Sequence, residues 1–144
     1  MALNGVIVAD KPAGWTSHDV VARCRKLLGE RSVGHLGTLD PMATGVLPLV
    51  IGRMTRLTQF YSGSAKSYEG TIRLGISTDT YDADGEVVDS RHPIQVSLEE
   101  LRAAGRQFVG PLQQVPPPFS AKKIKGVPAY KLARKKVEVA MKPV

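Results

Sequence analysis

The stretch from residue 34 to residue 47 combines two ionisable side chains with a backbone that can bend sharply. It contains three glycines, and its ionisable residues are His35 and Asp40. Pro41 disfavours helical geometry at Asp40, and the glycines let the backbone approach a ligand, so the carboxylate can project into a cleft. Such a carboxylate can attack or stabilise an electron-poor carbon. From the pattern alone, Asp40 is more often a turn former and His35 more often structural.

The basic side chains of the chain are concentrated near one end. Between residues 122 and 142 there are eight Lys or Arg residues and one acid, Glu138, whereas the rest of the chain carries 12 basic and 12 acidic residues. The whole net charge of +7 therefore comes from this segment. A local excess of positive charge favours phosphate binding. A solvated, lysine-rich helix and tail explains the same charges equally well.

The composition is that of a soluble globular protein, and 144 residues suit one domain. No apolar run approaches the roughly 20 residues that span a bilayer, and the start lacks the order of a signal peptide. We therefore expect a cytoplasmic protein without a membrane segment. Cys24 is the single cysteine, and its helical spacing from Val20 and Val21 predicts a place in the core. Three scattered histidines offer no metal-ligand spacing, so no metal site is predicted.

The elements around residues 34–47 can be predicted from the apolar pattern. Residues 6–8 form an apolar run before a Pro/Gly turn, which predicts a strand. Ser17 is a candidate helix cap, and the spacing of apolar residues predicts a helix that ends at Gly29. Residues 46–51 are predicted to form a buried strand despite Pro48.

The second half of the chain continues this alternation of helices and strands. The further predicted elements are a short helix over 53–61, a strand over 66–76, a hairpin turn at 82–85 with its return strand at 86–88, a helix from the capping box at 97–100 to about residue 110, and a basic helix over 127–135. Intermixed helices and hairpins predict an α+β fold, with a mixed, mainly antiparallel sheet and flanking helices.

Residues 34–47 resemble the motif GHxGxLDPxAxGxL of TruB-type tRNA pseudouridine synthases and their dyskerin relatives, and they match every fixed position. Residues 66–68 are similar to the K-x-Y segment of that family. Residues 116–126 are similar to its PPxxSAxKxxG segment, and the matches cover essentially the whole chain. The compact start at Gly5 favours the stand-alone bacterial type.

This resemblance implies an enzyme that isomerises uridine to pseudouridine in the T-loop of tRNA, at position 55, without a cofactor. It implies that Asp40 is the catalytic carboxylate, and that Tyr68 stacks on the flipped base and helps to remove its C5 proton. His35 would occupy the space that the base vacates. The implied partner is the T-arm of tRNA, bound by a monomeric protein. The residues expected to contact RNA are Lys11, Lys66, Lys122, Lys123, Lys125 and Arg134.

The resemblance also implies that residues 1–144 are a partial catalytic domain with an incomplete pseudouridine synthase fold. Further strands, a PUA-like domain and the GTYxR-type motif, whose arginine pairs with the aspartate, are not in this sequence. Weak or absent turnover is therefore predicted for the isolated chain. The main alternative is a non-catalytic tRNA-binding fragment. A metalloenzyme and a glycosidase are weaker alternatives, because neither a ligand motif nor a second paired acid is evident.

Overall fold

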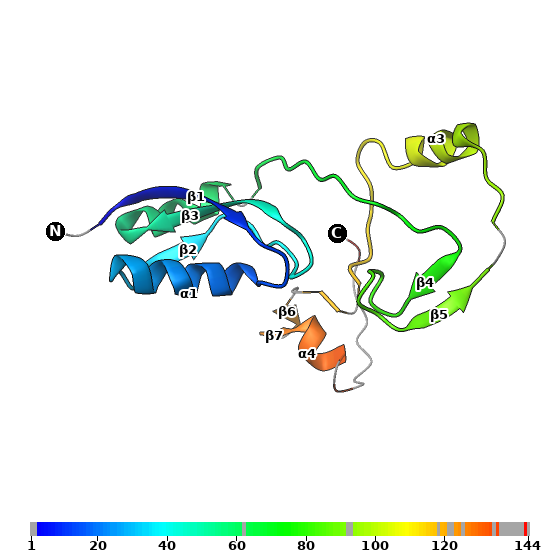
Figure 1. Cartoon of the computed structure of the whole chain (residues 1–144). Helices are drawn as coiled ribbons and strands as arrows, with labels where there is room; N and C mark the ends of the chain where they lie inside the picture. The colour runs from blue at the N-terminus through cyan, green and yellow to red at the C-terminus, as the bar shows by residue number, and fades with distance from the viewer. Residues whose placement is uncertain are drawn as a thin grey trace. The chain divides into compact units, whose positions relative to one another are not determined.

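The computed structural model of the chain describes residues 3–61, 63–91, 94–117, 119–120, 123–124, 126–133, 135 and 143. The chain forms two compact units, residues 1–69 and residues 70–144. Figure 1 labels the elements of both. The stretch at 34–47 and Tyr68 belong to the first unit, which is described first.

The first unit is a three-stranded antiparallel sheet with one long helix packed on it (Figure 1). The strands β1 (Gly5–Lys11), β3 (Gly45–Ile51) and β2 (Val33–His35) lie in that order, so β3 is central. Helix α1 (Ser17–Leu28) follows β1. The buried core joins the helix to the sheet and consists of Val20, Val21, Val33, Leu47, Leu49 and Ile51. The predicted strands at 6–8 and 46–51 are confirmed, and Cys24 packs against this core.

Pro48 is tolerated in the central strand because its missing N–H falls where the neighbouring strand ends. The Pro48 carbonyl accepts a hydrogen bond from Leu36 N–H at 2.9 Å, just beyond the last β2–β3 pair, His35 with Leu49. The amide nitrogen of a strand residue points to the same side as its carbonyl, so the proline removes no donor from the ladder itself. The strand prediction therefore holds despite the proline.

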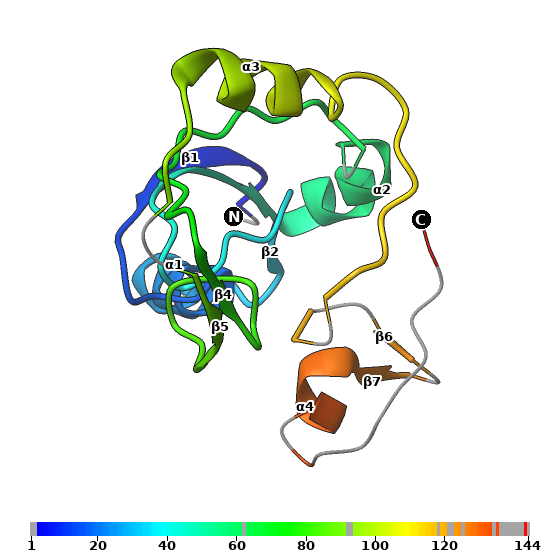
Figure 2. The same ribbon diagram turned by 90° about the vertical axis from the view of Figure 1, so that its right-hand side faces the viewer.

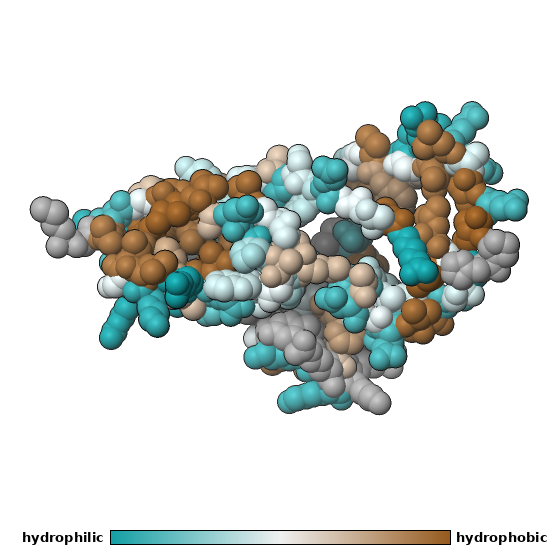
Figure 3. All heavy atoms as spheres, viewed as in Figure 1, coloured by the Kyte–Doolittle hydropathy of each residue, from teal (hydrophilic) through white to brown (hydrophobic). Residues whose placement is uncertain are grey.

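The two faces of this sheet differ in how far their side chains are exposed to solvent. The alternating residues Leu47 and Leu49 are buried under α1, whereas Val46 is 71% exposed on the opposite face. Val6 and Val8 of β1 share that second face by register and are 53% and 66% exposed. Apolar side chains gather over β1 and β3 in the space-filling view (Figure 3). The face under α1 is therefore buried, whereas the second face is mostly exposed except at Val50, which is only 1% exposed.

The N-cap of helix α1 lies one residue earlier than predicted. Thr16, not Ser17, is the N-cap, and it forms a capping box with Asp19. The hydrogen bonds from the Thr16 side chain and backbone lower the pKa of the Asp19 carboxyl below its usual value. Gly29 ends the helix in the left-handed conformation at φ 62°, as predicted. Leu27, which shares the helical spacing of the core residues, is 68% exposed.

The chain after β3 differs from the prediction. The helix expected over 53–61 is divided into the 3-10 helix η1 (Gly52–Leu57) and the single α-helical turn α2 (Thr58–Tyr61). The strand expected over 66–76 is wrong for most of its length, because residues 64–73 have no regular structure and the strand begins only at Ile76. Alternating residues form a strand only where a neighbouring backbone completes the hydrogen bonds, and the described part of the chain contains no such pairing for 66–73.

The described residues of the second unit form two small hairpins and two helices. β4 (Ile76–Thr78) pairs with β5 (Val87–Ser90), which confirms the predicted hairpin. Helix α3 (Leu98–Arg106) has the predicted capping box of Ser97 and Glu100 but ends before residue 110. β6 (Lys123–Ile124) pairs with β7 (Val127–Pro128), which leads into α4 (Ala129–Ala133) (Figure 2).

The α+β prediction is confirmed, because helices and strands alternate and every strand pair among the described residues is antiparallel. The strands form three separate small sheets, not one. Each helix in the described part of the chain is too short or too polar to cross a bilayer.

Candidate functional site

The predicted catalytic aspartate lies in the loop that joins β2 to the central strand β3. This loop covers residues 36–44, and the exposed Asp40 is near its middle. The Asp40 carbonyl accepts a hydrogen bond from Ala43 N–H at 3.0 Å, which closes a turn after the aspartate. The aspartate therefore occupies a defined turn while its carboxylate remains accessible to solvent.

The backbone on both sides of Asp40 is anchored to the segment that joins β1 to α1. Before it, the Ser17 hydroxyl accepts from Leu39 N–H at 2.9 Å and donates to the Leu39 carbonyl at 3.2 Å. After it, the Pro41 carbonyl accepts from Gly14 N–H at 2.7 Å and from Lys11 Nζ at 3.2 Å. Asp40, which is exposed, is thus the residue of 39–41 whose backbone these anchors do not hold directly.

Lys11 has a different environment from the one that the sequence suggested. It was expected to contact RNA, but its side chain is fully buried. Its ammonium group donates to the carbonyls of Pro12 at 3.0 Å, Trp15 at 2.6 Å and Pro41 at 3.2 Å. A buried charge needs such partners. We therefore propose that Lys11 holds the turn after β1 against the Asp40 loop, and we do not include it in the RNA surface.

Replacing Lys11 with methionine should lower the free energy of unfolding by about 2–3 kcal/mol, because three carbonyls lose their charged donor while the side-chain volume is kept. The measurement is a urea titration of the protein that contains this chain. Lys26→Met on α1 is the matched control, because Lys26 is exposed and its replacement should change stability by less than about 0.5 kcal/mol. Equal midpoint shifts in the two variants would contradict this role for Lys11.

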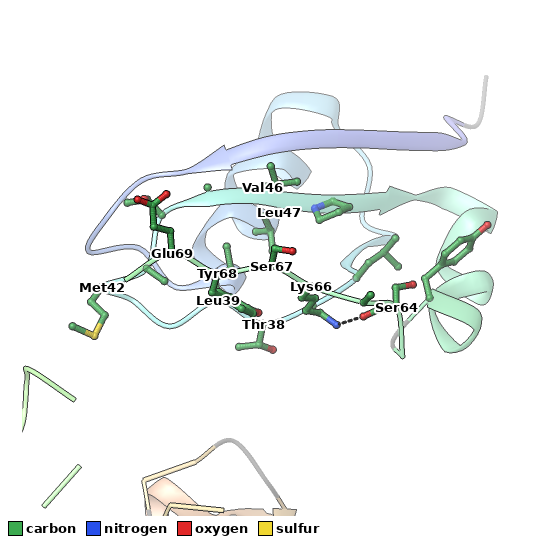
Figure 4. Close-up of a pocket in the computed structure, with 18 residues that line it drawn as sticks. Thr38, Leu39, Met42, Val46, Leu47, Ser64, Lys66, Ser67, Tyr68 and Glu69 are labelled. Atoms are coloured by element: carbon green, nitrogen blue, oxygen red, sulfur yellow. Dashed lines mark hydrogen bonds between the residues drawn. The ribbon is translucent and has the colours of Figure 1, made fainter. Parts of the chain in front are cut away.

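A cavity of about 710 Å³ lies beside the Asp40 loop, entirely within the first unit (Figure 4). One wall is the loop and the start of β3, including Leu39, Met42 and Leu47, and the other is the irregular segment 64–69. Tyr68 lines this cavity and is 69% exposed. Residues 66–69, where a strand was predicted, therefore form part of a wall of the cavity instead.

Lys66 lines the same cavity and lies close to the glycine-rich loop. Its Nζ donates to the Ser64 carbonyl at 3.1 Å (Figure 4). A Cβ atom placed on Gly37 would stand 3.3 Å from Lys66 Cε, so the glycine leaves room for the Lys66 side chain beside the loop. The structure thus brings Lys66 and Tyr68 of the K-x-Y segment to the same wall.

Asp40 and His35 lie next to residues of the cavity wall but do not line the cavity themselves. Leu39 and Met42, on either side of Asp40, are both in the wall. His35 is half-buried at the end of β2, and its Nδ1 lies 2.7 Å from the Gly37 carbonyl. Because a carbonyl can only accept, Nδ1 carries the proton, which orients the ring and leaves Nε2 free to accept when the ring is neutral.

The remaining predicted RNA contacts are only partly described. Lys122, Lys125 and Arg134 lie outside the described residues, and Lys123 is placed only by its backbone in β6. Within the described part of the chain, no three His, Cys, Asp or Glu side chains gather as metal ligands would. Ser17 is a further residue of the site that the sequence reasoning missed, since it was interpreted as a helix cap. The threonine directly before it was the available signal, because Thr16 can cap the helix and free Ser17 for another role.

The chain is similar to known proteins over almost its whole length. Residues 25–144 match the family described as "TruB family pseudouridylate synthase (N terminal domain)". The chain is 54% identical over 142 residues to tRNA pseudouridine synthase B of Solibacter usitatus (strain Ellin6076), covering 99% of this chain and 48% of that protein. It is 51% identical over 139 residues to tRNA pseudouridine synthase B of Thermobifida fusca (strain YX), covering 96% of this chain and 47% of that protein.

The chain therefore spans about half the length of the curated relatives that it matches. Among solved structures, it is similar to a chain in "Crystal Structure of a Cbf5-Nop10-Gar1 Complex", with a TM-score of 0.55 and 31% sequence identity. That likeness covers 83% of this chain and 31% of the other. It agrees with the α+β architecture described above.

Proposed function

Because this chain belongs to the TruB family of pseudouridylate synthases, we propose that the protein containing it isomerises uridine to pseudouridine in tRNA. The observation that carries the proposal is the arrangement of the loop. A motif that matches the family at every fixed position presents an exposed Asp40 beside a cavity lined by Tyr68 and Lys66. We also propose that the protein acts in the cytoplasm as a monomer and requires no cofactor.

The reaction exchanges one bond to the ribose for another. The bond from C1′ to N1 breaks, a bond from C1′ to C5 forms, the C5 proton leaves and N1 gains a proton. The carboxylate of Asp40 would attack or stabilise the ribose or the base. Attack at C1′, attack at C6 and a glycal route all use the same carboxylate. The exposure of Asp40 suits any of these routes, because a nucleotide outside its helix can reach the carboxylate.

The target uridine must leave its stack before Asp40 can reach it. The cavity beside the loop offers space for the base, with apolar side chains from Leu39, Met42 and Leu47 and the exposed ring of Tyr68. Tyr68 would stack on the base, and its phenol would assist removal of the C5 proton. His35, held by its bond to Gly37, would fill the space that the base leaves in the RNA.

The proposed substrate is the T-loop uridine of tRNA at position 55. Lys66 in the cavity wall is exposed and can approach a phosphate near the target nucleotide. We propose that the basic residues 122–142 extend this contact, as their excess of positive charge favours. Affinity for tRNA should then fall steeply as the salt concentration rises.

The test is release of tritium from tRNA labelled at C5 of uridine, because the isomerisation expels that hydrogen. The protein containing this chain should release the label from a tRNA with uridine at the T-loop position. The matched substrate carries cytidine there and uridine elsewhere, and it should release none. Equal release from both would contradict T-loop specificity, and no release from either would contradict the activity itself.

A non-catalytic tRNA-binding role is the second candidate. It is favoured by the environment of Asp40, because no described residue forms an ion pair or hydrogen bond with its carboxylate. A carboxylate without a partner cation is less precisely held for chemistry. Salt-dependent binding of tRNA without any tritium release would support this role and would overturn the enzymatic one.

A further inference from the structure

The hydroxyl of Ser17 makes two hydrogen bonds to a single residue that is distant in sequence. It accepts from Leu39 N–H at 2.9 Å and donates to the Leu39 carbonyl at 3.2 Å, across 22 positions of the chain. Ser17 is only 3% exposed, so water does not compete for these bonds. The capping of α1 is done by Thr16, and the Ser17 hydroxyl is not needed for it. The helix therefore does not explain why a hydroxyl is placed there.

Leu39 directly precedes Asp40, and its side chain packs against the core of the first unit. The N–H and the carbonyl that Ser17 binds both belong to Leu39. On the other side of Asp40, the Pro41 carbonyl is held by Gly14 and Lys11. Two fixed residues thus flank an aspartate whose own side chain is exposed. This arrangement restricts the positions that the Asp40 carboxylate can adopt and still leaves it exposed to solvent.

We propose that Ser17 is a positioning residue for Asp40, holding Leu39 so that the carboxylate meets the target nucleotide in a reactive geometry. This inference rests on the proposed function. Removing the hydroxyl would leave the Leu39 N–H and carbonyl without their partner and would free the backbone before Asp40. A misplacement of about 1 Å at a reacting group costs up to about 10²-fold in rate, even when the mutated residue does not touch substrate.

The experiment compares Ser17→Ala with Ser32→Ala in the protein containing this chain. Ser32 is a matched control because its hydroxyl also bonds a distant backbone carbonyl, that of Gly52 at 3.1 Å, on the far side of the β2–β3 pairing from the Asp40 loop. The measured quantities are the single-turnover rate of pseudouridine formation, the Kd for tRNA, and the hydrogen exchange rate of the Leu39 amide. Ser17→Thr, which keeps a hydroxyl, tests for rescue.

We expect Ser17→Ala to slow the single-turnover rate by about 10- to 100-fold while the Kd for tRNA stays within about twofold. The Leu39 amide should exchange faster in this variant and not in Ser32→Ala, and Ser17→Thr should recover most of the rate. A merely structural role would lower the melting temperature and weaken tRNA binding in parallel with the rate, and that result would overturn the proposal.

An unchanged rate in Ser17→Ala, or unchanged exchange of the Leu39 amide, would also overturn it. Failure of the proposed function is a separate result. In that case the unmodified protein forms no pseudouridine at all, and the proposed positioning role of Ser17 is rejected together with the proposed reaction. If the unmodified protein is active, Asp40→Asn is inactive and Ser17→Ala is fully active, only the inference about Ser17 is wrong.

Discussion

Replacing Asp40 with asparagine should slow pseudouridine formation by about 10³-fold or more, which is the scale expected when a group acting directly in the chemical step is removed. Asparagine keeps the size and polarity of the side chain but cannot attack ribose or base as an anion. Because Asp40 is exposed and its described anchors are backbone bonds of its neighbours, the loop should keep its shape. The Kd for tRNA should therefore stay within about twofold.

The measurement is tritium release under single-turnover conditions, with filter binding beside it. Asp10→Asn is the matched control, since Asp10 is an exposed aspartate of β1 that is not in the Asp40 loop, and this variant should be fully active. Wild-type turnover by Asp40→Asn would exclude the aspartate from the chemistry. Binding without turnover in both the unmodified protein and the variant would instead identify an RNA-binding module.

Replacing Tyr68 with leucine should cause the next largest loss, because it removes both the aromatic ring and the phenol. The ring lines the cavity and is 69% exposed, so it can contribute base stacking worth about 1–3 kcal/mol. Tyr68→Phe keeps the ring and loses only the hydroxyl, so its affinity should be unchanged while the rate falls by about 10²-fold. The leucine variant should show this loss of rate together with weaker binding.

The two Tyr68 variants separate stacking from proton transfer. Rates and Kd values are measured under the same single-turnover conditions for both. Tyr81→Phe provides the control, because Tyr81 is 72% exposed and belongs to the second unit, outside the cavity wall. If Tyr68→Phe turns over at the wild-type rate, the phenol takes no part in proton removal, and the residue acts by stacking alone.

Much of the local structure was predictable because it depends on contacts between near neighbours. The periodic apolar residues of α1 and the apolar run of β3 each specify their own element, and Gly29 ends the helix by its left-handed backbone. The turn chemistry of 82–85 and the capping box of Ser97 also act over a few residues. Their physical causes lie within one element or one turn, so the residue types suffice.

The prediction failed where an element depends on a partner outside itself. Residues 66–73 alternate partly as a strand does, yet they form no strand because no backbone among the described residues pairs with them. The burial of Lys11 was equally invisible, because a lysine at the end of a strand is ordinarily exposed. Only the three carbonyls that converge on its ammonium group, one of them 30 residues away, make that burial possible.

The sequence by itself identified His35, Asp40 and Tyr68 as candidate site residues, because residues 34–47 and 66–68 match two separate segments of one family. Only the tertiary structure decided what surrounds them. It showed that Ser17 and Lys11 fasten the residues on either side of Asp40, and that the segment of Tyr68 is a cavity wall. The two hydrogen bonds span 22 and 30 positions of the chain, and they form only when the sheet and α1 have packed together.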